Sequence, residues 1–194
     1  MESASCAKAD LPTLTAGKLT IATGEPAYYP WVIDDAPESG AGFEAAVAYA
    51  VATELGFAAE DVSWVRTTFD EAIAPGAKNF DFNLQQYSIT DERKAAVDFS
   101  SPYYETTQTI ITVEGSKAAG ATTIAELKDL AIGAATGTTS FAAIEDVIQP
   151  TGGAQAFNSN DDAKAALAAG QIDALVVDLP TALYLTAVEI DGGV

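Results

Sequence analysis

The chain has 194 residues, of which 48% are hydrophobic, so it is long enough for two small α/β lobes with buried cores. It carries 9 Lys and Arg against 28 Asp and Glu, a formal charge of −19, and it has no histidine and one cysteine. This charge disfavours nucleic acid and anionic membranes as partners, because no basic patch can neutralise phosphates. The absence of histidine excludes Ser-His-Asp and Cys-His catalytic sites and histidine-bound metals, and we expect no metal and no cofactor.

Residues 1–16 are predicted to form a flexible tether, and they contain the single cysteine, Cys6. This segment lacks both the basic start and the apolar run of a signal peptide. Cys6 follows small residues and precedes a polar stretch, an arrangement similar to the processed end of a bacterial lipoprotein. Cys6 is therefore either a lipid anchor or an incidental cysteine in a tail. No apolar run in the sequence is long enough to span a bilayer.

The next part of the chain, residues 17–107, is predicted to be a first lobe in which strands alternate with helices. Strands are predicted at 18–23, 62–66 and 80–84, where β-branched and aromatic residues predominate. Helical spacing of apolar residues predicts a helix over 43–55 that ends at Gly56, and Thr68 with Glu71 predicts a capped helix start. This alternation indicates right-handed βαβ units and a mostly parallel sheet.

An extended run over 106–113 is predicted to leave the first lobe, with residues 108–114 as a hinge strand. A second lobe is predicted over 115–189, and residues 190–194 are expected to begin a second hinge. Its strands are predicted at 131–134, 155–157 and 174–177, and its helices at a segment beginning at Thr123 and at 141–148, 161–168 and 181–188. Open α/β sheets bind ligands beyond the carboxyl ends of their strands, so two facing lobes predict a binding cleft.

One arginine, Arg93, lies just after a corner that is rich in hydroxyl groups. A guanidinium beside such hydroxyls can hold a small carboxylate through a bidentate charged pair, as in a binding protein for an organic acid. Strand alternation places Ser88 and Gln86 on the same side of the corner. The alternative is a surface helix in which Arg93 pairs with Asp91 or Glu92.

A Gly-Thr-Thr-Ser corner at 137–140 follows a predicted strand and opens a predicted helix. Backbone N–H groups, hydroxyls and the positive end of a helix dipole suit a carboxylate there. The alternative, helix capping by Thr138 or Thr139, accounts for one threonine only. Asp178 ends an apolar strand before Leu-Pro, where its carboxylate can bind an ammonium group or cap the following helix.

The loop after the first strand contains two prolines and three aromatic residues. Tyr28 in this loop can stack on a ligand side chain or attract a cation, whereas we expect Trp31 to fill the core. Glu25 is a second candidate acceptor for an amine, or else a solvated charge.

Four segments occur in a characteristic order: Leu19-Thr20-Ile21-Ala22-Thr23 with Ala27-Tyr28-Tyr29-Pro30-Trp31, then Gly42-Phe43-Glu44, then Ser88-Ile89-Thr90-Asp91-Glu92-Arg93 through Pro102-Tyr103-Tyr104, then Gly137-Thr138-Thr139 with Asp173–Asp178. Together they resemble the extracellular solute-binding proteins of polar amino-acid ABC transporters, family 3. The third segment is the most specific. The resemblance implies a two-lobed α/β fold like that of the type II periplasmic binding proteins, with two open, mostly parallel sheets joined by a hinge.

The resemblance also implies capture of a small amino acid by hinge closure and its delivery to a membrane ABC permease. Arg93 is expected to clamp the α-carboxylate with help from Thr138, and Asp178 to take the α-amino group. The other expected contacts come from Ser88, Gln86, Tyr28, Glu25 and Thr139. The implied location is extracytoplasmic, in the periplasm or as a cell-surface lipoprotein, and a monomer without enzymatic activity is expected.

Two features depart from the family pattern. Gln86 and Tyr87 stand where small or aliphatic residues are common, and Tyr87 has no assigned role. The sequence stops at Val194, where the family continues with a strand that returns to the first lobe, so this return is expected to be missing. Two alternatives remain open: a dehydratase of this fold that uses Glu25 or Asp178 as general acid on a cyclic acid, and the ligand-binding domain of a membrane sensor.

Overall fold

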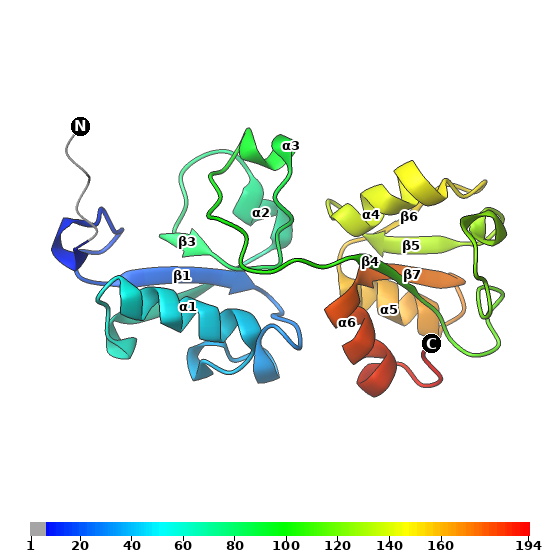
Figure 1. Ribbon diagram of the computed structural model, residues 1–194, viewed down its shortest axis with the longest axis horizontal. Coiled ribbons are helices and arrows are strands. Elements are labelled where there is room, and N and C mark those ends of the chain that lie inside the picture. The colour runs from blue at the N-terminus through cyan, green and yellow to red at the C-terminus, as the bar shows by residue number, and fades with distance from the viewer. Residues whose placement is uncertain (1–6) are drawn as a thin grey trace. The chain divides into compact units, whose positions relative to one another are not determined.

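The computed structural model describes residues 7–194; Cys6, either a lipid anchor or an incidental cysteine in the sequence analysis, lies outside the described residues. The described chain divides into two compact units, with the boundary after Pro102. Each unit has its own sheet, with strand order β2-β1-β3 in the first and β4-β7-β5-β6 in the second (Figure 1). Two α/β units agree with the two-lobed fold that the sequence predicts. Among the described residues, no helix is both long enough and apolar enough to cross a membrane.

The first unit is a parallel sheet with helices between its strands. Its strands are β1 (Leu19–Gly24), β2 (Val62–Thr67) and β3 (Phe82–Asn83), and both neighbours run parallel to β1. Its helices are α1 (Phe43–Glu54), α2 (Phe69–Ile73) and α3 (Asp91–Lys94), with short 3-10 turns at Lys8–Asp10, Ile33–Asp35, Pro37–Ser39 and Ala59–Asp61. The capping box predicted at Thr68 and Glu71 is confirmed.

Helix α1 covers one face of β1 with alanine side chains. Ala48 and Ala52 pack against Leu19 and Ile21 in the main core of this unit. The helix itself is confirmed, but its larger apolar residues are not its buried ones, since Phe43 is 39% exposed. Small side chains let the backbone of α1 approach the sheet closely, and they do not reveal the buried face as a periodic stripe of large residues would.

The loop that follows β1 docks on the start of α1. The backbone N–H groups of Phe43 and Glu44 donate to the carbonyls of Pro30 and Trp31, at 3.1 and 3.0 Å, which satisfies donors that a helix start leaves unpaired. Trp31 is 4% exposed, and its ring meets the edge of the Phe43 ring at a centroid distance of 5.9 Å. The expected core role of Trp31 is therefore confirmed.

The second unit has a mixed four-stranded sheet. Its strands are β4 (Gln108–Ile111), β5 (Ile132–Ala135), β6 (Gln155–Phe157) and β7 (Ala174–Asp178). β5 runs parallel to β6 and β7, and β4 is antiparallel to β7. The run predicted as a hinge strand thus contributes β4 to the second sheet. Beyond β4, Val113 forms an antiparallel bridge with Gly193.

Helices cover both faces of this second sheet (Figure 1). They are the 3-10 turn Ile124–Leu127, α4 (Thr139–Ala143) continued by a π-helix over Ile144–Ile148, α5 (Asn160–Ala168), and α6 (Leu179–Tyr184) continued by a π-helix over Leu185–Glu189. Strand β7 alternates between the two faces. Ala174 and Val176 pack with the residues that follow α4, whereas Leu175 and Val177 pack with α5 and α6.

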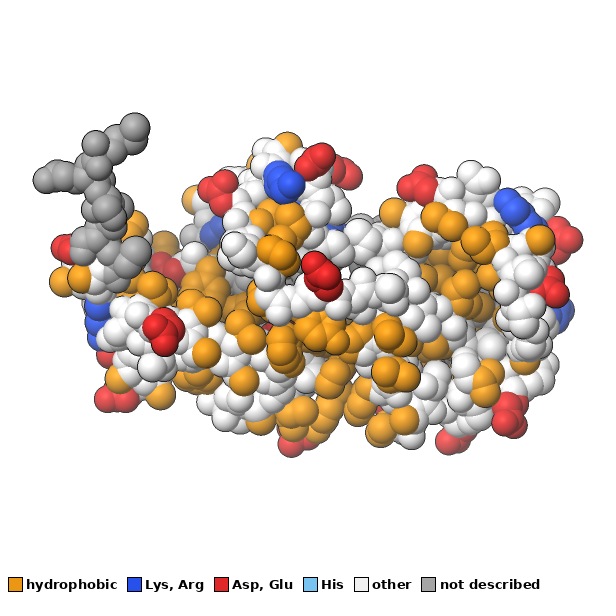
Figure 2. Space-filling model, viewed as in Figure 1, with side chains coloured by type: hydrophobic (Ala, Val, Ile, Leu, Met, Phe, Trp, Pro, Cys, Tyr) orange, Lys and Arg blue, Asp and Glu red, His pale blue; other side chains and the backbone are white. Residues whose placement is uncertain are grey.

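On the face that Figure 2 displays, acidic side chains are spread out rather than gathered in one place. Figure 2 shows Asp and Glu side chains at separate points on the face that it displays, with fewer Lys and Arg among them. This distribution fits the formal charge of −19, and it leaves no broad basic patch on that face.

Replacing Gly42 is expected to destabilise the first unit, because an added Cβ would lie 2.5 Å from the Trp31 carbonyl oxygen at a φ of +101°. We expect Gly42→Ala to lower the free energy of unfolding by about 3 kcal/mol or more. The matched control is Gly76→Ala, which has a φ of +116° but nothing within 4 Å of the added Cβ. It should cost only the backbone strain, about 1 kcal/mol.

Urea unfolding followed by tryptophan fluorescence measures both effects, since the two tryptophans, Trp31 and Trp64, lie in the first unit. If both variants lost the same free energy of unfolding, the close contact between the loop and α1 would contribute nothing beyond the backbone strain.

Candidate functional site

The predicted site residues follow the carboxyl ends of strands in each unit. In the first unit Glu25 and Tyr28 follow β1, and Gln86 follows β3; in the second unit Thr138 follows β5, and Asp178 ends β7. Within each sheet these strands run parallel, so their carboxyl ends meet at one edge. Each unit therefore gathers its own set of polar groups.

Arg93 is buried, not a surface residue. Its side chain lies in α3, and the residue is 8% exposed. Its Nη1 donates to the Ser88 carbonyl at 2.9 Å, and its guanidinium lies 5.3 Å from the centre of the Phe69 ring. In the same helix it is Lys94 that pairs with Asp91, at 3.0 Å. The burial of Arg93 contradicts the surface position that the alternative assumed.

Tyr87, which the sequence leaves without a role, forms part of the surroundings of Arg93. The Arg93 guanidinium lies 5.5 Å from the centre of the Tyr87 ring. The Tyr87 ring lies 4.3 Å from the Phe69 ring, and its hydroxyl donates to the Phe69 carbonyl. Burial raises the pKa of the Tyr87 phenol, so it remains a neutral donor at physiological pH. Phe69 and Tyr87 thus present an aromatic pair to the cation.

Gln86 is held by a buried carboxylate from α1. Its backbone N–H donates to Glu44 Oε1 at 2.9 Å, and its side-chain amide donates to Glu44 Oε2. Glu44 is 1% exposed, and Gln86 has a φ of +53°, a conformation that costs energy in a residue other than glycine. Glu44 therefore stabilises the bend that leads into Ser88. A contact between Gln86 and a ligand stays a prediction.

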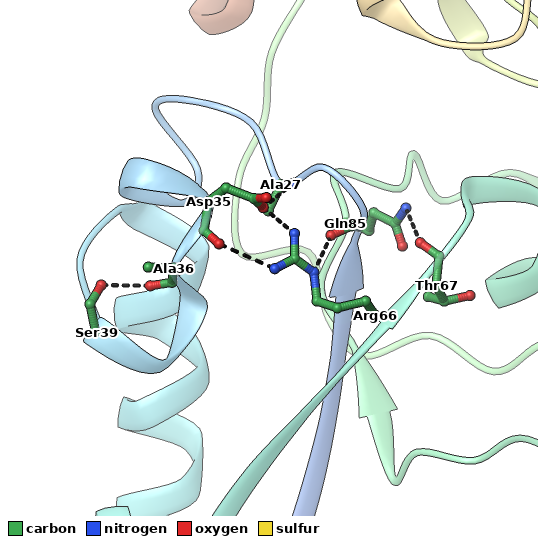
Figure 3. Close-up of polar contacts among 8 residues, drawn as sticks. Ala27, Asp35, Ala36, Ser39, Arg66, Thr67 and Gln85 are labelled. Carbon is green, nitrogen blue, oxygen red and sulfur yellow. Dashed lines mark hydrogen bonds and ion pairs between the residues drawn. The ribbon is translucent and has the colours of Figure 1, made fainter.

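Arg66 fixes the loop that carries Glu25 and Tyr28 (Figure 3). Its Nε donates to the Gly24 carbonyl at 2.7 Å, and its guanidinium forms an ion pair with Asp35. The same Asp35 carboxylate accepts the backbone N–H of Ala27 at 2.7 Å. One guanidinium thus joins the end of β1 to the far side of the loop. Sequence reasoning missed this residue, although a lone arginine at the carboxyl end of a predicted strand is a detectable signal.

Asp178 stands at the N-cap position of α6, but its side chain makes no capping hydrogen bond. Its Oδ1 accepts instead from Gln108 Nε2 at 2.7 Å. The same Nε2 lies 3.3 Å from Thr139 Oγ1, and Gln108 Oε1 accepts from the Ser140 hydroxyl at 2.6 Å. Gln108 thus joins Asp178 to the start of α4. Nothing local in the sequence marks Gln108, because its partners are 31 to 70 positions away.

The two threonines of the 137–140 corner differ in their contacts. Thr138 caps α4, since its Oγ1 accepts from the Phe141 N–H at 3.1 Å and donates to the Ala135 carbonyl at 2.7 Å. Thr139 contacts Gln108 instead. Capping thus accounts for one threonine, as the sequence predicts. A ligand contact by either threonine stays a prediction.

The chemistry of these groups is that of binding. The first unit supplies a cation held beside a backbone carbonyl and two aromatic rings, and a guanidinium suits a carboxylate. The second supplies a carboxylate, which suits an ammonium group. Among residues 7–194, no group of three or more Cys, Asp and Glu side chains is arranged to hold a metal ion.

Comparisons with known proteins agree with this chemistry. The L-arginine-binding protein of Pseudomonas aeruginosa is 32% identical over 170 residues, which are 87% of this chain and 64% of that protein. The structure of an ancestral arginine-binding protein bound to glutamine matches with a TM-score of 0.77 and 29% identity, over 93% of this chain and 78% of that one. An ancestral amino-acid-binding protein described as a precursor of cyclohexadienyl dehydratase matches with a TM-score of 0.74 and 32% identity, over 89% of this chain and 75% of that one.

The chain spans 64% of the length of its curated relative, the Pseudomonas protein. The family model of the bacterial extracellular solute-binding proteins, family 3, matches residues 19–178, which include every candidate residue from Glu25 to Asp178. The two-lobed fold expected from the sequence is that of these relatives. The chain belongs to the bacterial extracellular solute-binding proteins, family 3.

Proposed function

We propose that this chain binds a free amino acid, with Arg93 on the α-carboxylate and Asp178 on the α-amino group. The burial of Arg93 carries this proposal. A carboxylate can accept in bidentate fashion from the planar donors of a guanidinium, and burial strengthens that pair. The Ser88 carbonyl and the aromatic pair hold the guanidinium in one orientation, so little ordering is left for the ligand to impose.

The zwitterion explains why both units carry site residues. Arg93 in the first unit matches the negative end of an amino acid, and Asp178 in the second matches the positive end. We propose that the ligand binds the first unit and that hinge closure then brings Asp178, Thr138 and Thr139 onto it. Closure would also exclude water, which strengthens both charged contacts.

The ligand is proposed to be a polar amino acid, with arginine and glutamine as the first candidates. The support is that similar proteins are an L-arginine-binding protein and an arginine-binding protein that was found with glutamine. Tyr28 and Glu25, which follow β1, are proposed to contact the ligand side chain. An aromatic face and a carboxylate both suit a cationic or amide end.

The whole protein is proposed to deliver its ligand to a membrane ABC permease from outside the cytoplasm, either in the periplasm or, if Cys6 is lipidated, from the cell surface. The support is membership of a family of extracellular solute-binding proteins.

Catalysis is not proposed, although one similar structure is described as a precursor of a dehydratase. That ancestral protein is itself described as an amino-acid-binding protein. Incubation of the chain with a cyclohexadienyl acid should therefore give no elimination product by ultraviolet absorbance.

Arg93→Ala should abolish amino-acid binding. Loss of a buried, bidentate charged pair is expected to weaken binding by at least about 100-fold. The measurement is isothermal titration calorimetry of this chain against a panel of common amino acids, beginning with arginine and glutamine. Lys94→Ala is the matched control, because it also removes a positive charge, one residue from Arg93. The Lys94 side chain is 53% exposed and is paired with Asp91.

The control should bind like the wild type. Arg93→Lys, which keeps the charge but not the bidentate geometry, should fall between the two. Unchanged affinity in folded Arg93→Ala, or failure of the wild-type chain to bind any amino acid in the panel, would contradict the proposal.

Tyr87 should affect binding through its contact with Arg93. Tyr87→Leu removes the ring beside the guanidinium and is expected to weaken binding by about 5- to 10-fold, since an exposed to partly buried cation–π contact contributes about 1 kcal/mol. Tyr87→Phe keeps the ring and loses only the hydrogen bond to Phe69, so its affinity should lie within about twofold of the wild type. Equal losses in both variants would show that the hydroxyl, not the ring, positions Arg93.

A further inference from the structure

We propose that Gln108 is a positioning residue, which orients the Asp178 carboxylate and thereby sets the preference for ligands that carry an α-ammonium group. The inference rests on the proposed function, because it concerns the group that would accept the ligand amine. Neither the sequence patterns nor the comparisons assign a role to Gln108.

The hydrogen bonds of Gln108 fix the orientation of its amide. Nε2 carries two hydrogens, and it lies 2.7 Å from Asp178 Oδ1 and 3.3 Å from Thr139 Oγ1. Oε1 accepts from the Ser140 hydroxyl at 2.6 Å. A reversed amide would place its oxygen against the Asp178 carboxylate, which repels it. The amide therefore has one favourable orientation, and in that orientation it donates toward Asp178.

The sheet explains why these side chains meet. Gln108 is the first residue of β4, and it lies directly opposite Asp178, the last residue of β7, in an antiparallel pair. Side chains of directly opposed residues lie on the same face of a sheet, close enough for contact. Thr139 and Ser140 begin α4, just beyond the end of β5. Gln108 thus joins three segments that come from distant parts of the sequence.

The residue type matters because an amide is neutral. A carboxylate offers about four acceptor positions, and Gln108 uses one of them on Oδ1. A lysine or arginine at this place would also orient Asp178, but it would offset the charge that attracts an ammonium group. Asp61 and Asp35 are instead held by cations. Asp61 contacts Lys18 at 2.8 Å, and Asp35 contacts the Arg66 guanidinium. The neutral amide of Gln108 therefore orients Asp178 without itself offsetting the negative charge.

The backbone beside this contact restricts Asp178 further. The N–H of Leu179, which follows Asp178, donates to the carbonyl of Thr107 at 3.0 Å. Residues 107 and 108 thus bind both the side chain of Asp178 and the peptide group that follows it. With its backbone already held, the remaining freedom of Asp178 is rotation of its side chain, which is the freedom that the Gln108 amide restricts.

The test compares one amino acid with its desamino analogue, which has the same side chain and carboxylate but no α-ammonium group. The amino acid is the tightest ligand of the wild type in the calorimetric panel. Gln108→Leu should weaken binding of the amino acid by about 10-fold, because a charge-assisted hydrogen bond to Asp178 is lost. Binding of the desamino analogue should change by less than about twofold, since Asp178 has no partner on it. Gln155→Leu, on the exposed strand β6, is the matched control and should alter neither affinity.

Ser140→Ala provides a second, milder variant. It removes the hydroxyl that donates to the Gln108 amide. It should therefore weaken binding of the amino acid relative to its desamino analogue, by a smaller factor than Gln108→Leu does. Circular dichroism checks the fold of the second unit, which contains no tryptophan.

The outcomes separate the two proposals. If the wild type binds no amino acid, the proposed function fails, and this inference fails with it. If the wild type binds but Gln108→Leu weakens both ligands equally or neither, Gln108 has only a structural role, and this inference alone is wrong. Should Gln108→Leu not fold, an unchanged ligand ratio in Ser140→Ala would likewise contradict the positioning role of Gln108.

Discussion

The burial of one cation, Arg93, is the constraint on which the first unit depends. A guanidinium withdrawn from water needs partners that match its planar donors, and in this unit they include the Ser88 carbonyl and the faces of Phe69 and Tyr87. None of these three groups carries a formal charge, so they orient the guanidinium without neutralising it. Other features of the unit support that orientation. The buried Glu44 stabilises the bend at Gln86, two residues before Ser88, and thereby positions the carbonyl that Arg93 contacts.

The second unit applies the same principle to the opposite charge. Asp178 ends a buried strand, and the neutral amide of Gln108 orients its carboxylate. Asp61 is held differently, since it contacts two lysines, which lower the pKa of its carboxyl group to about 2. In each unit, neutral groups are thus among the contacts of the charge proposed to meet the ligand. These neutral contacts orient the charge and do not themselves offset it.

Local patterns in the sequence predicted the strands, the capped helices and the strand ends at which the site residues lie. They also singled out Arg93 and Asp178 as candidates, because an arginine beside a hydroxyl-rich corner and a carboxylate at the end of an apolar strand are visible in the sequence itself. They did not identify the groups that orient those charges. The contact between Tyr87 and Phe69 joins residues 18 positions apart, and that between Gln108 and Asp178 spans 70 positions. Such pairs depend on which strands become neighbours, as does the alanine face by which α1 packs on the sheet.

The chain enters the second unit as a paired strand whose backbone contacts reach the site residue Asp178 proposed there. Strand β4 pairs with β7 from Gln108 onward, and the Thr107 carbonyl accepts from Leu179. Further along, Thr112 exchanges two backbone hydrogen bonds with Val194, at 2.9 and 3.0 Å. Rotation within residues 107–114 would break these bonds and displace Asp178. Before them, Tyr103–Thr106 are exposed and belong to no helix or strand. Tyr103–Thr106 therefore lack the strand pairing that holds Gln108 opposite Asp178.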